Sequence, residues 1–110
     1  MFKNVGENTL DEIVLEDGFY ILHFQNESKD VQVFERAIHS SFIQIHFCLR
    51  GKSKFLFNNG SYSFDVLDNR SILLYNPQRT LPIHLENQPK TTLLSLLISI
   101  EKFHSLFSKE

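Results

Sequence analysis

The sequence of 110 residues contains no tryptophan, one cysteine and one alanine. A single cysteine excludes an internal disulfide framework and a zinc site built from cysteines. The cysteine, Cys48, lies between Phe47 and Leu49, which indicates a small buried apolar residue rather than a reactive thiol. Few small helix formers alongside eleven phenylalanines favour strands, because flat rings pack well on a pleated surface. We therefore expect an all-β fold.

Neither sign of charge dominates: 11 basic and 13 acidic residues give a net charge of −2. A nucleic-acid-binding domain normally has a cationic face, so we do not expect these residues to contact DNA themselves. No segment reaches the roughly 18 apolar residues needed to span a bilayer, and residues 1–7 lack the apolar stretch of a secretory signal. The sequence thus predicts a cytoplasmic protein with no membrane partner.

Catalytic motifs are also missing. Glycine occurs only at Gly6, Gly18, Gly51 and Gly60, which does not support a phosphate-cradling loop. No Ser/His/Asp ordering and no close carboxylate pair stand out. The sequence predicts that the chain is not an enzyme.

Residues 42–49 show the clearest alternation of the chain. One face of such a strand carries Ile43, Ile45, Phe47 and Leu49, and the other carries Phe42, Gln44, His46 and Cys48. Alternation alone does not decide which face lines the interior. Residues 31–38 fit a strand or a short helix, and their Val and Phe content favours a strand. Residues 91–98 are apolar on both faces, as is typical of a central strand covered on both sides.

Turns and caps complete the predicted fold. Asn59-Gly60 predicts a tight hairpin, because both residues accept positive φ, and Asp68-Asn69 predicts a second turn. Ser99 suits a helix N-cap, and the residues after it form one apolar stripe at helical spacing: Ile100, Phe103, Leu106 and Phe107. We expect about eight antiparallel strands over residues 13–98, curled into an open barrel or jelly roll, and a helix over residues 100–108.

Three stretches resemble the sensing domain of AraC/XylS-family transcription regulators: FCLRG at 47–51, ILLYNP at 72–77 and LLISIEKF at 96–103. The resemblance covers about two thirds of the chain. It implies a cupin-like double-stranded β-helix, with residues 1–110 as one sensing domain. It also implies dimerising helices and a helix-turn-helix DNA-binding domain after residue 110. DNA contact would then be made only through that further domain.

Cupin enzymes hold a metal with several His and Glu ligands, and this chain matches that pattern only in part. Gln44 stands near the position of the Glu ligand. His39 matches one histidine of a His-x-His pair, but the other position of the pair is Ala37. His84 could be the late His ligand, but the loop before it has the wrong spacing. We therefore expect no metal and no cofactor. His23 and His46 lie among apolar neighbours, which favours hydrogen-bonded structural roles.

The leading hypothesis is a domain that senses a small-molecule effector and forms a homodimer. Polar residues placed to face a cavity, and so the predicted ligand-binding residues, are Gln44, His46, Tyr75, Arg79 and His84. The predicted dimerisation residues are Ile100, Phe103 and Phe107. The alternatives are a stand-alone cupin enzyme or small-molecule-binding cupin protein, and an interaction module whose barrel is filled by Phe side chains.

Overall fold

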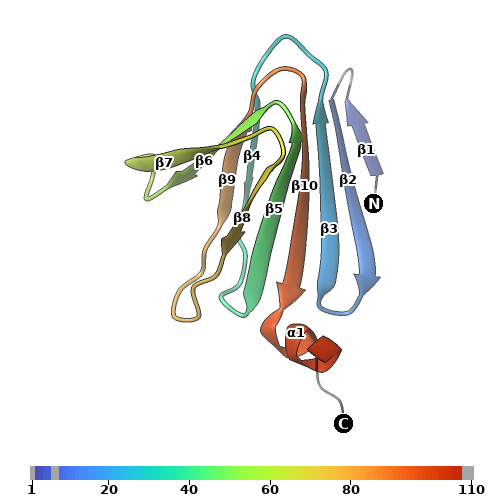
Figure 1. The fold of residues 1–110 in the computed structure, drawn as a ribbon, viewed down its shortest axis with the longest axis vertical. Coiled ribbons are helices and arrows are strands. Elements are labelled where there is room, and N and C mark those ends of the chain that lie inside the picture. Colours follow the sequence, from blue (N-terminus) through green and yellow to red (C-terminus); the bar gives the residue numbers. More distant parts are fainter. Residues whose placement is uncertain (1, 6–7, 108–110) are drawn as a thin grey trace.

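Residues 2–5 and 8–107 are described by a computed structural model, as ten strands in two antiparallel sheets followed by one helix (Figure 1). Sheet A contains, in spatial order, β1 (Phe2–Val5), β2 (Asn8–Glu16), β3 (Phe19–Asn26), β10 (Thr91–Ser99), β5 (Phe42–Arg50) and β8 (Arg70–Leu74). Sheet B contains β4 (Gln32–Arg36), β9 (Ile83–Asn87), β6 (Lys52–Phe57) and β7 (Tyr62–Leu67). The helix is α1 (Ile100–Phe107).

The all-β prediction with a terminal helix is confirmed, but strands begin earlier and are more numerous than expected. β2 starts at Asn8 rather than near residue 13, and β1 precedes it. These strands pair with each other from Phe2↔Asp11 to Val5↔Asn8. The ladder satisfies their backbone groups at the edge of sheet A without needing an alternating apolar pattern. The ambiguous segment 31–38 contains β4, a strand as favoured.

The core lies between the two sheets and is made by alternate residues of their facing strands. The largest of its fully buried side chains are Leu22, Phe24 and Leu93 from sheet A, and Phe55, Ile83 and Leu85 from sheet B. Full burial of one such side chain contributes about 1.5–3 kcal/mol. Cys48 is buried in the same cluster, as predicted.

The hairpin predicted at Asn59-Gly60 joins β6 to β7, and its turn is wider than two residues. Asn58, Asn59 and Gly60 all have positive φ, at 58°, 58° and 86°. The Gly60 N–H donates to the Phe57 carbonyl at 3.0 Å, and the Ser61 N–H donates to the Asn58 carbonyl at 3.2 Å. Asparagine tolerates this left-handed backbone better than other non-glycine residues, which explains its use at two consecutive positions.

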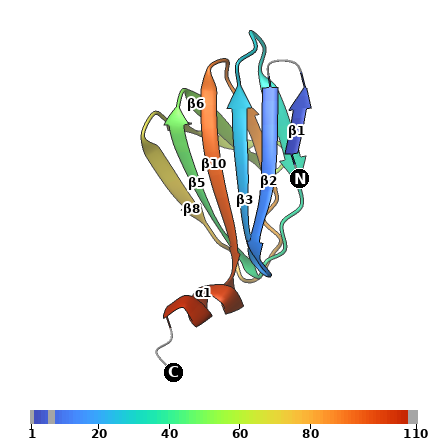
Figure 2. The same cartoon turned by 90° about the vertical axis from the view of Figure 1, so that its right-hand side faces the viewer.

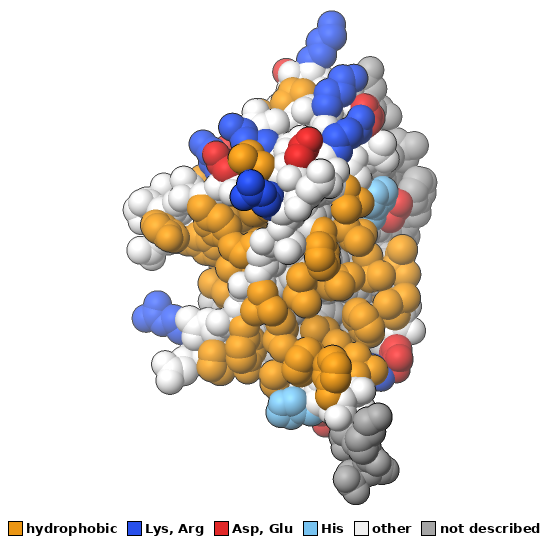
Figure 3. All heavy atoms as spheres, in the orientation of Figure 1, with side chains coloured by type: hydrophobic (Ala, Val, Ile, Leu, Met, Phe, Trp, Pro, Cys, Tyr) orange, Lys and Arg blue, Asp and Glu red, His pale blue; other side chains and the backbone are white. Residues whose placement is uncertain are grey.

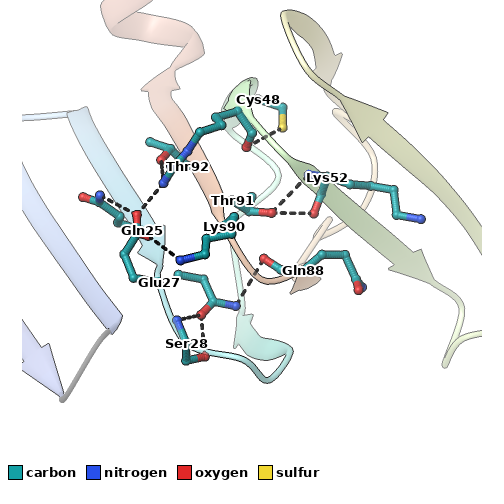
Figure 4. Close-up of polar contacts among 11 residues, drawn as sticks. Gln25, Glu27, Ser28, Cys48, Lys52, Gln88, Lys90, Thr91 and Thr92 are labelled. Atoms are coloured by element: carbon teal, nitrogen blue, oxygen red, sulfur yellow. Dashed lines mark hydrogen bonds and ion pairs between the residues drawn. The ribbon is translucent and has the colours of Figure 1, made fainter.

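One end of the molecule is closed by side chains that tie the two sheets together (Figure 4). Thr91 on β10 donates from Oγ1 to the Lys52 carbonyl at 3.1 Å and accepts from the Lys52 N–H at 3.0 Å. Asn26 on β3 donates from Nδ2 to the carbonyls of Asn87 and Gln88, at 3.0 and 3.2 Å. These buried polar side chains are therefore hydrogen-bonded, although the Asn87 Nδ2 has no partner.

β10 is central in sheet A, between β3 and β5, but only one of its faces is covered. Leu93, Ser95 and Leu97 point into the core and are buried. On the other face, Leu94 and Leu96 remain partly exposed, and Ile98 at its end near α1 is buried. The prediction that this strand is covered on both sides is wrong for the part of the chain described, because sheet B packs against the inner face alone.

α1 continues directly from β10 at the end of sheet A (Figure 2). The predicted N-cap is confirmed, because the Ser99 Oγ accepts a hydrogen bond from the Lys102 N–H at 3.0 Å. The predicted helix extends to residue 108, and this last position lies outside the described residues. No residue of α1 is buried, and Phe107 keeps 67% of its surface exposed. The apolar stripe of α1 is therefore largely uncovered.

Candidate functional site

The β6–β7 hairpin projects away from the rest of the molecule (Figure 1), and a cleft lies beside it. β6 pairs with β7 along its whole length, from Lys52 to Phe57, but with β9 only from Ser53 to Phe55. Beyond Phe55 the two neighbours diverge, because no ladder bonds hold the hairpin tip against β9. The loop 75–82, which connects β8 to β9, lies on the other side of the opening.

One part of the cleft is an apolar hollow of about 470 Å³. Its lining consists of side chains from the hairpin, β8 and the loop: Phe57, Tyr62, Phe64, Ile72, Leu74 and Leu81. The Phe57 and Phe64 rings stack with centroids 5.4 Å apart and an angle of 4° between their planes. The Phe64 ring also lies 5.7 Å from the Phe55 ring in the core. A flat apolar wall thus faces aliphatic side chains across the hollow.

The other part is a polar hollow of about 610 Å³ that shares Phe57, Tyr62 and Leu81 with the apolar one. The polar side chains among its lining residues are Glu35, Arg36, Asn58, Asn59, Tyr62, Asn76, Arg79, Thr80 and His84. A ligand that fills both parts meets an apolar surface at one end and amide, guanidinium and imidazole groups at the other. Mostly apolar sites with a few placed polar groups are typical for small molecules.

The charged and titratable side chains of the polar hollow differ in their contacts with other residues of the chain. Arg36 donates from Nη2 to the Glu12 carboxylate at 2.9 Å, and this hydrogen bond lowers the pKa of Glu12. His84 Nδ1 lies 3.3 Å from the Glu35 carboxylate. Arg79 is exposed on the loop, where its backbone N–H donates to the Asn76 carbonyl at 3.4 Å. A guanidinium in this position suits an anionic group on a ligand.

A hydrogen-bonded chain lies behind the cleft and connects it to β10. The Gln44 Nε2 donates to the carbonyl of Leu81, a cleft residue, at 2.5 Å. The Gln44 Oε1 lies 2.9 Å from His46 Nε2, and His46 Nδ1 lies 2.6 Å from the Ser95 Oγ on β10. Burial lowers the pKa of His46 to about 3, so its imidazole is neutral at pH 7.

The structure separates the five predicted ligand-binding residues into three groups. Arg79 and His84 line the polar hollow. Gln44 and His46 face the interior but are only 1% and 0% exposed, and their polar atoms are occupied by each other, Leu81 and Ser95. Tyr75 is exposed and lines neither hollow. The face of β5 left undecided by alternation is settled, since Gln44, His46 and Cys48 lie inside.

Sequence reasoning did not select the aromatic wall of the cleft. Phe57, Tyr62 and Phe64 alternate along a hairpin, a pattern that equally describes a filled core. Their signal was the concentration of rings on both sides of the Asn59-Gly60 turn. The predicted dimerisation residues all lie on α1, where the Phe103 and Phe107 ring centroids are 4.8 Å apart.

The donor set of the interior does not fit a metal. Within residues 2–5 and 8–107, no three His, Cys, Asp or Glu side chains gather as a metal site needs. Gln44, at the position considered for an acid ligand, is bonded to the Leu81 carbonyl and to His46. His39 is exposed and its Nδ1 lies 2.9 Å from the Ser41 Oγ.

Comparison with known proteins shows the fold. Similar solved structures include an HTH_3 family transcriptional regulator from Vibrio cholerae, with a TM-score of 0.63 and 11% identity over 84% of this chain and 51% of that one. The cupin domain of Schizosaccharomyces pombe Cnp3 has a TM-score of 0.62 and 13% identity, covering 94% of this chain and 69% of the other. The Cupin_2 domain of an XRE family transcriptional regulator from Enterobacter cloacae has a TM-score of 0.61 and 9% identity, covering 84% and 96%.

The chain therefore has a cupin-like double-stranded β-helix fold, as the resemblance implied. It spans about half of the length of the Vibrio regulator. No protein-family model matches the sequence. No curated protein matches it either. Among the described residues, α1 is too short to cross a membrane.

Proposed function

We propose that this chain is the effector-sensing and dimerisation domain of an AraC-type transcription regulator. The observation that carries the proposal is the two-part cleft, with stacked Phe57 and Phe64 rings at one end and Arg79 at the other. The family-like motifs and the regulators among the structural neighbours support it. The role is binding rather than catalysis, carried out in the cytoplasm, and a further domain contacts DNA.

The effector is a small molecule with a flat apolar body and one anionic or strongly polar end. The body lies on the Phe57 and Phe64 rings, where offset stacking contributes about 0.5–1.5 kcal/mol beyond burial. The polar end reaches Arg79. The two hollows meet at Phe57, Tyr62 and Leu81, so one ligand can occupy both of them at once.

The signal travels by population shift. A ligand against Leu81 favours one position of the loop 75–82, and the Gln44–His46–Ser95 chain ties that loop to β10. β10 runs without a break into α1. A ligand that binds the two arrangements of β10 and α1 unequally changes their populations, and only then does the signal reach an attached domain.

A thermal-shift screen of sugars, amino acids and planar aromatic acids tests ligand binding, because a ligand of the folded state raises the unfolding midpoint. We expect at least one planar acid to stabilise the wild type. The shift should be lost in Leu74→Arg, which fills the apolar hollow. It should persist in Leu67→Arg, because Leu67 is 46% exposed and lies outside the cleft.

The coupling to α1 has its own readout, the amide hydrogen exchange of residues 100–107. A bound ligand should change that exchange in the wild type. No stabilising compound in the panel, or an undiminished shift in Leu74→Arg, would contradict the cleft as the sensor. A ligand that binds without affecting α1 would indicate a small-molecule-binding cupin protein instead.

A further inference from the structure

An unbroken row of aliphatic side chains crosses the outer face of sheet A. The pairing registers align Ile13 with Ile21, Ile21 with Leu96, Leu96 with Ile45, and Ile45 with Leu73. The row therefore spans β2, β3, β10, β5 and β8, with Leu96 at its centre. We call the row and its apolar neighbours on both sides the outer face.

The row toward the closed end extends this apolar area with Leu94 and Phe47, which are partly exposed. In the row toward α1, Phe19 is partly exposed, whereas Ile98 and Ile43 are buried, at 5% and 7% exposure. Charged side chains stand at the β2 margin of these rows, where His23 Nδ1 lies 3.4 Å from the Asp11 carboxylate and Glu16, opposite Phe19, forms an ion pair with Lys102. Figure 3 shows hydrophobic side chains collected over the middle of the molecule and charged side chains gathered at its upper end. The middle of the outer face is therefore apolar and carries no charged group that would repel an identical surface.

The outer face is as large as the largest apolar patch of a typical monomer. Four strand spacings of about 4.8 Å and one row spacing of about 7 Å, with the width of the rim side chains added, give a flat area of roughly 300 Å². The largest apolar patch on a typical monomer covers about 300–600 Å² and is often functional. Leu106 and Phe107 of α1, 49% and 67% exposed, add to it at one end. Together they provide an apolar centre for an interface, which in a stable complex buries ~800 Å² per partner.

The side chains at the two ends of the row are strongly exposed. Leu73 is 61% exposed on β8 and Ile13 is 46% exposed on β2. Ile21, Leu96 and Ile45, between them, are shielded only partly, by their lateral neighbours. A central strand with leucines on both faces predicts a second covering layer, and sheet B supplies only the first.

We propose that this second layer is the outer face of another copy of the chain. Two identical sheets have the same twist and the same side-chain spacing, so their apolar rows interdigitate as in an aligned sandwich with sheets about 10 Å apart. Such a contact is isologous and closes at two copies. A two-fold axis that runs midway between the two sheets, opposite Leu96 and parallel to β10, places β2 of one copy over β8 of the other. Both α1 helices then lie at the same end of the dimer.

This inference rests on the dimerisation part of the proposed function and is independent of the cleft. Sedimentation velocity on the 110-residue chain measures the mass in solution, and circular dichroism confirms folding of each variant. The face variant carries Ile13→Glu and Leu73→Glu. The control carries Leu67→Glu and Val33→Glu on the outside of sheet B, where the exposed fractions of 46% and 59% nearly match those of Ile13 and Leu73. A helix variant carries Phe107→Asp.

We expect the wild type and the control to sediment as dimers at tens of micromolar, and the face variant as a folded monomer. A monomeric wild type would overturn both the face contact and dimerisation. A dimeric face variant with a monomeric helix variant would overturn the face contact and leave dimerisation through α1 standing. A control that dissociates as fully as the face variant would also overturn the face contact, because any added charge would then have the same effect.

Discussion

His46 donates its N–H to Gln44, with 2.9 Å between Nε2 and Oε1, and this fixes the direction of every hydrogen bond around them. The Gln44 amide must donate to the Leu81 carbonyl, because a carbonyl has no proton to give. Gln44 therefore presents Oε1 to His46 as an acceptor. His46 Nδ1 is left to accept from the Ser95 hydroxyl. The chain of donors runs from β10 to the cleft and is complete only while the imidazole is neutral.

The first prediction concerns pH. Burial lowers the pKa of His46 to about 3, whereas the unfolded chain has the usual value of 6.5. Between pH 6.5 and 3, His46 is protonated in the unfolded state but not in the folded state. The free energy of unfolding therefore decreases as the pH is lowered from 6.5 toward 3. The limiting slope is about 1.4 kcal/mol per pH unit. Between pH 6.5 and 5, His46→Gln should show a shallower slope in urea unfolding, because glutamine does not titrate.

The comparison isolates His46, since the other histidines are the same in both chains. Glu12 and Glu27 have lowered pKa values through their hydrogen bonds with Arg36 and with Gln25 and Arg50, so their contributions fall at lower pH than this window. Equal slopes in the wild type and His46→Gln would show that His46 is protonated in the folded state after all.

How far local patterns reach into this fold is shown by residues 42–50. Alternation identifies the strand β5 but assigns Gln44 and His46 to neither side, because the face that carries them also carries the apolar Phe42 and Cys48. The decision depends on partners far along the chain: Leu81 and Ser95 satisfy the polar atoms inside. Short-range signals succeed at the Asn59-Gly60 turn and at the Ser99 cap, because both depend on neighbouring residues alone.

The candidate site divides in the same way. Arg79 and His84 belong to the polar residues predicted to face a cavity, and both line the polar hollow. The apolar hollow exists because β6 separates from β9 after Phe55, and this is a property of long-range pairing. Phe57 and Phe64 would be ordinary core residues if that ladder continued.

The second prediction compares two glycines with nearly equal backbones. Gly51 and Gly60 have φ of 88° and 86°, so alanine at either position costs about 1–2 kcal/mol of left-handed strain. A Cβ at Gly51 would lie 2.7 Å from the Thr91 Cα and 2.8 Å from the Lys90 carbonyl oxygen, whereas at Gly60 the nearest atom is 3.9 Å away. Gly51→Ala should lose about 1–3 kcal/mol more than Gly60→Ala. Urea unfolding measures both, and equal losses would show that the backbone at Lys90 gives way.

The third prediction concerns the cap of α1. Ser99→Ala removes the acceptor for the Lys102 N–H and should cost about 0.5–2 kcal/mol of stability. Ser105→Ala is the matched control, because Ser105 lies inside the helix, where its Oγ bonds to the Lys102 carbonyl. Alanine favours helix interiors, so this change should be neutral or slightly stabilising. Amide exchange over residues 100–107 should rise in Ser99→Ala only. A matching rise in Ser105→Ala would argue that side-chain bonds inside α1, rather than the cap, hold its first turn.

The fourth prediction concerns crosslinking through an introduced cysteine, for which the native Cys48 should not react. Cys48 is buried at 1% exposure, and burial raises the pKa of its thiol, so it should resist alkylation. Leu96→Cys then places the one reactive thiol at the centre of the outer face. Two such thiols face each other across the dimer at a sheet separation of about 10 Å, which is too far for a disulfide but within reach of a bifunctional maleimide.

Leu67→Cys is the control for chance encounters, because Leu67 is 46% exposed on the outside of sheet B. If labelling followed exposure alone, Leu67→Cys would give at least as much crosslinked dimer as Leu96→Cys. We expect the opposite order at low protein concentration: abundant covalent dimer from Leu96→Cys and little from Leu67→Cys. Adding Ile13→Glu and Leu73→Glu to Leu96→Cys should abolish the crosslink. A crosslink that survives those changes would place the contact between copies somewhere other than the Ile13–Leu73 row.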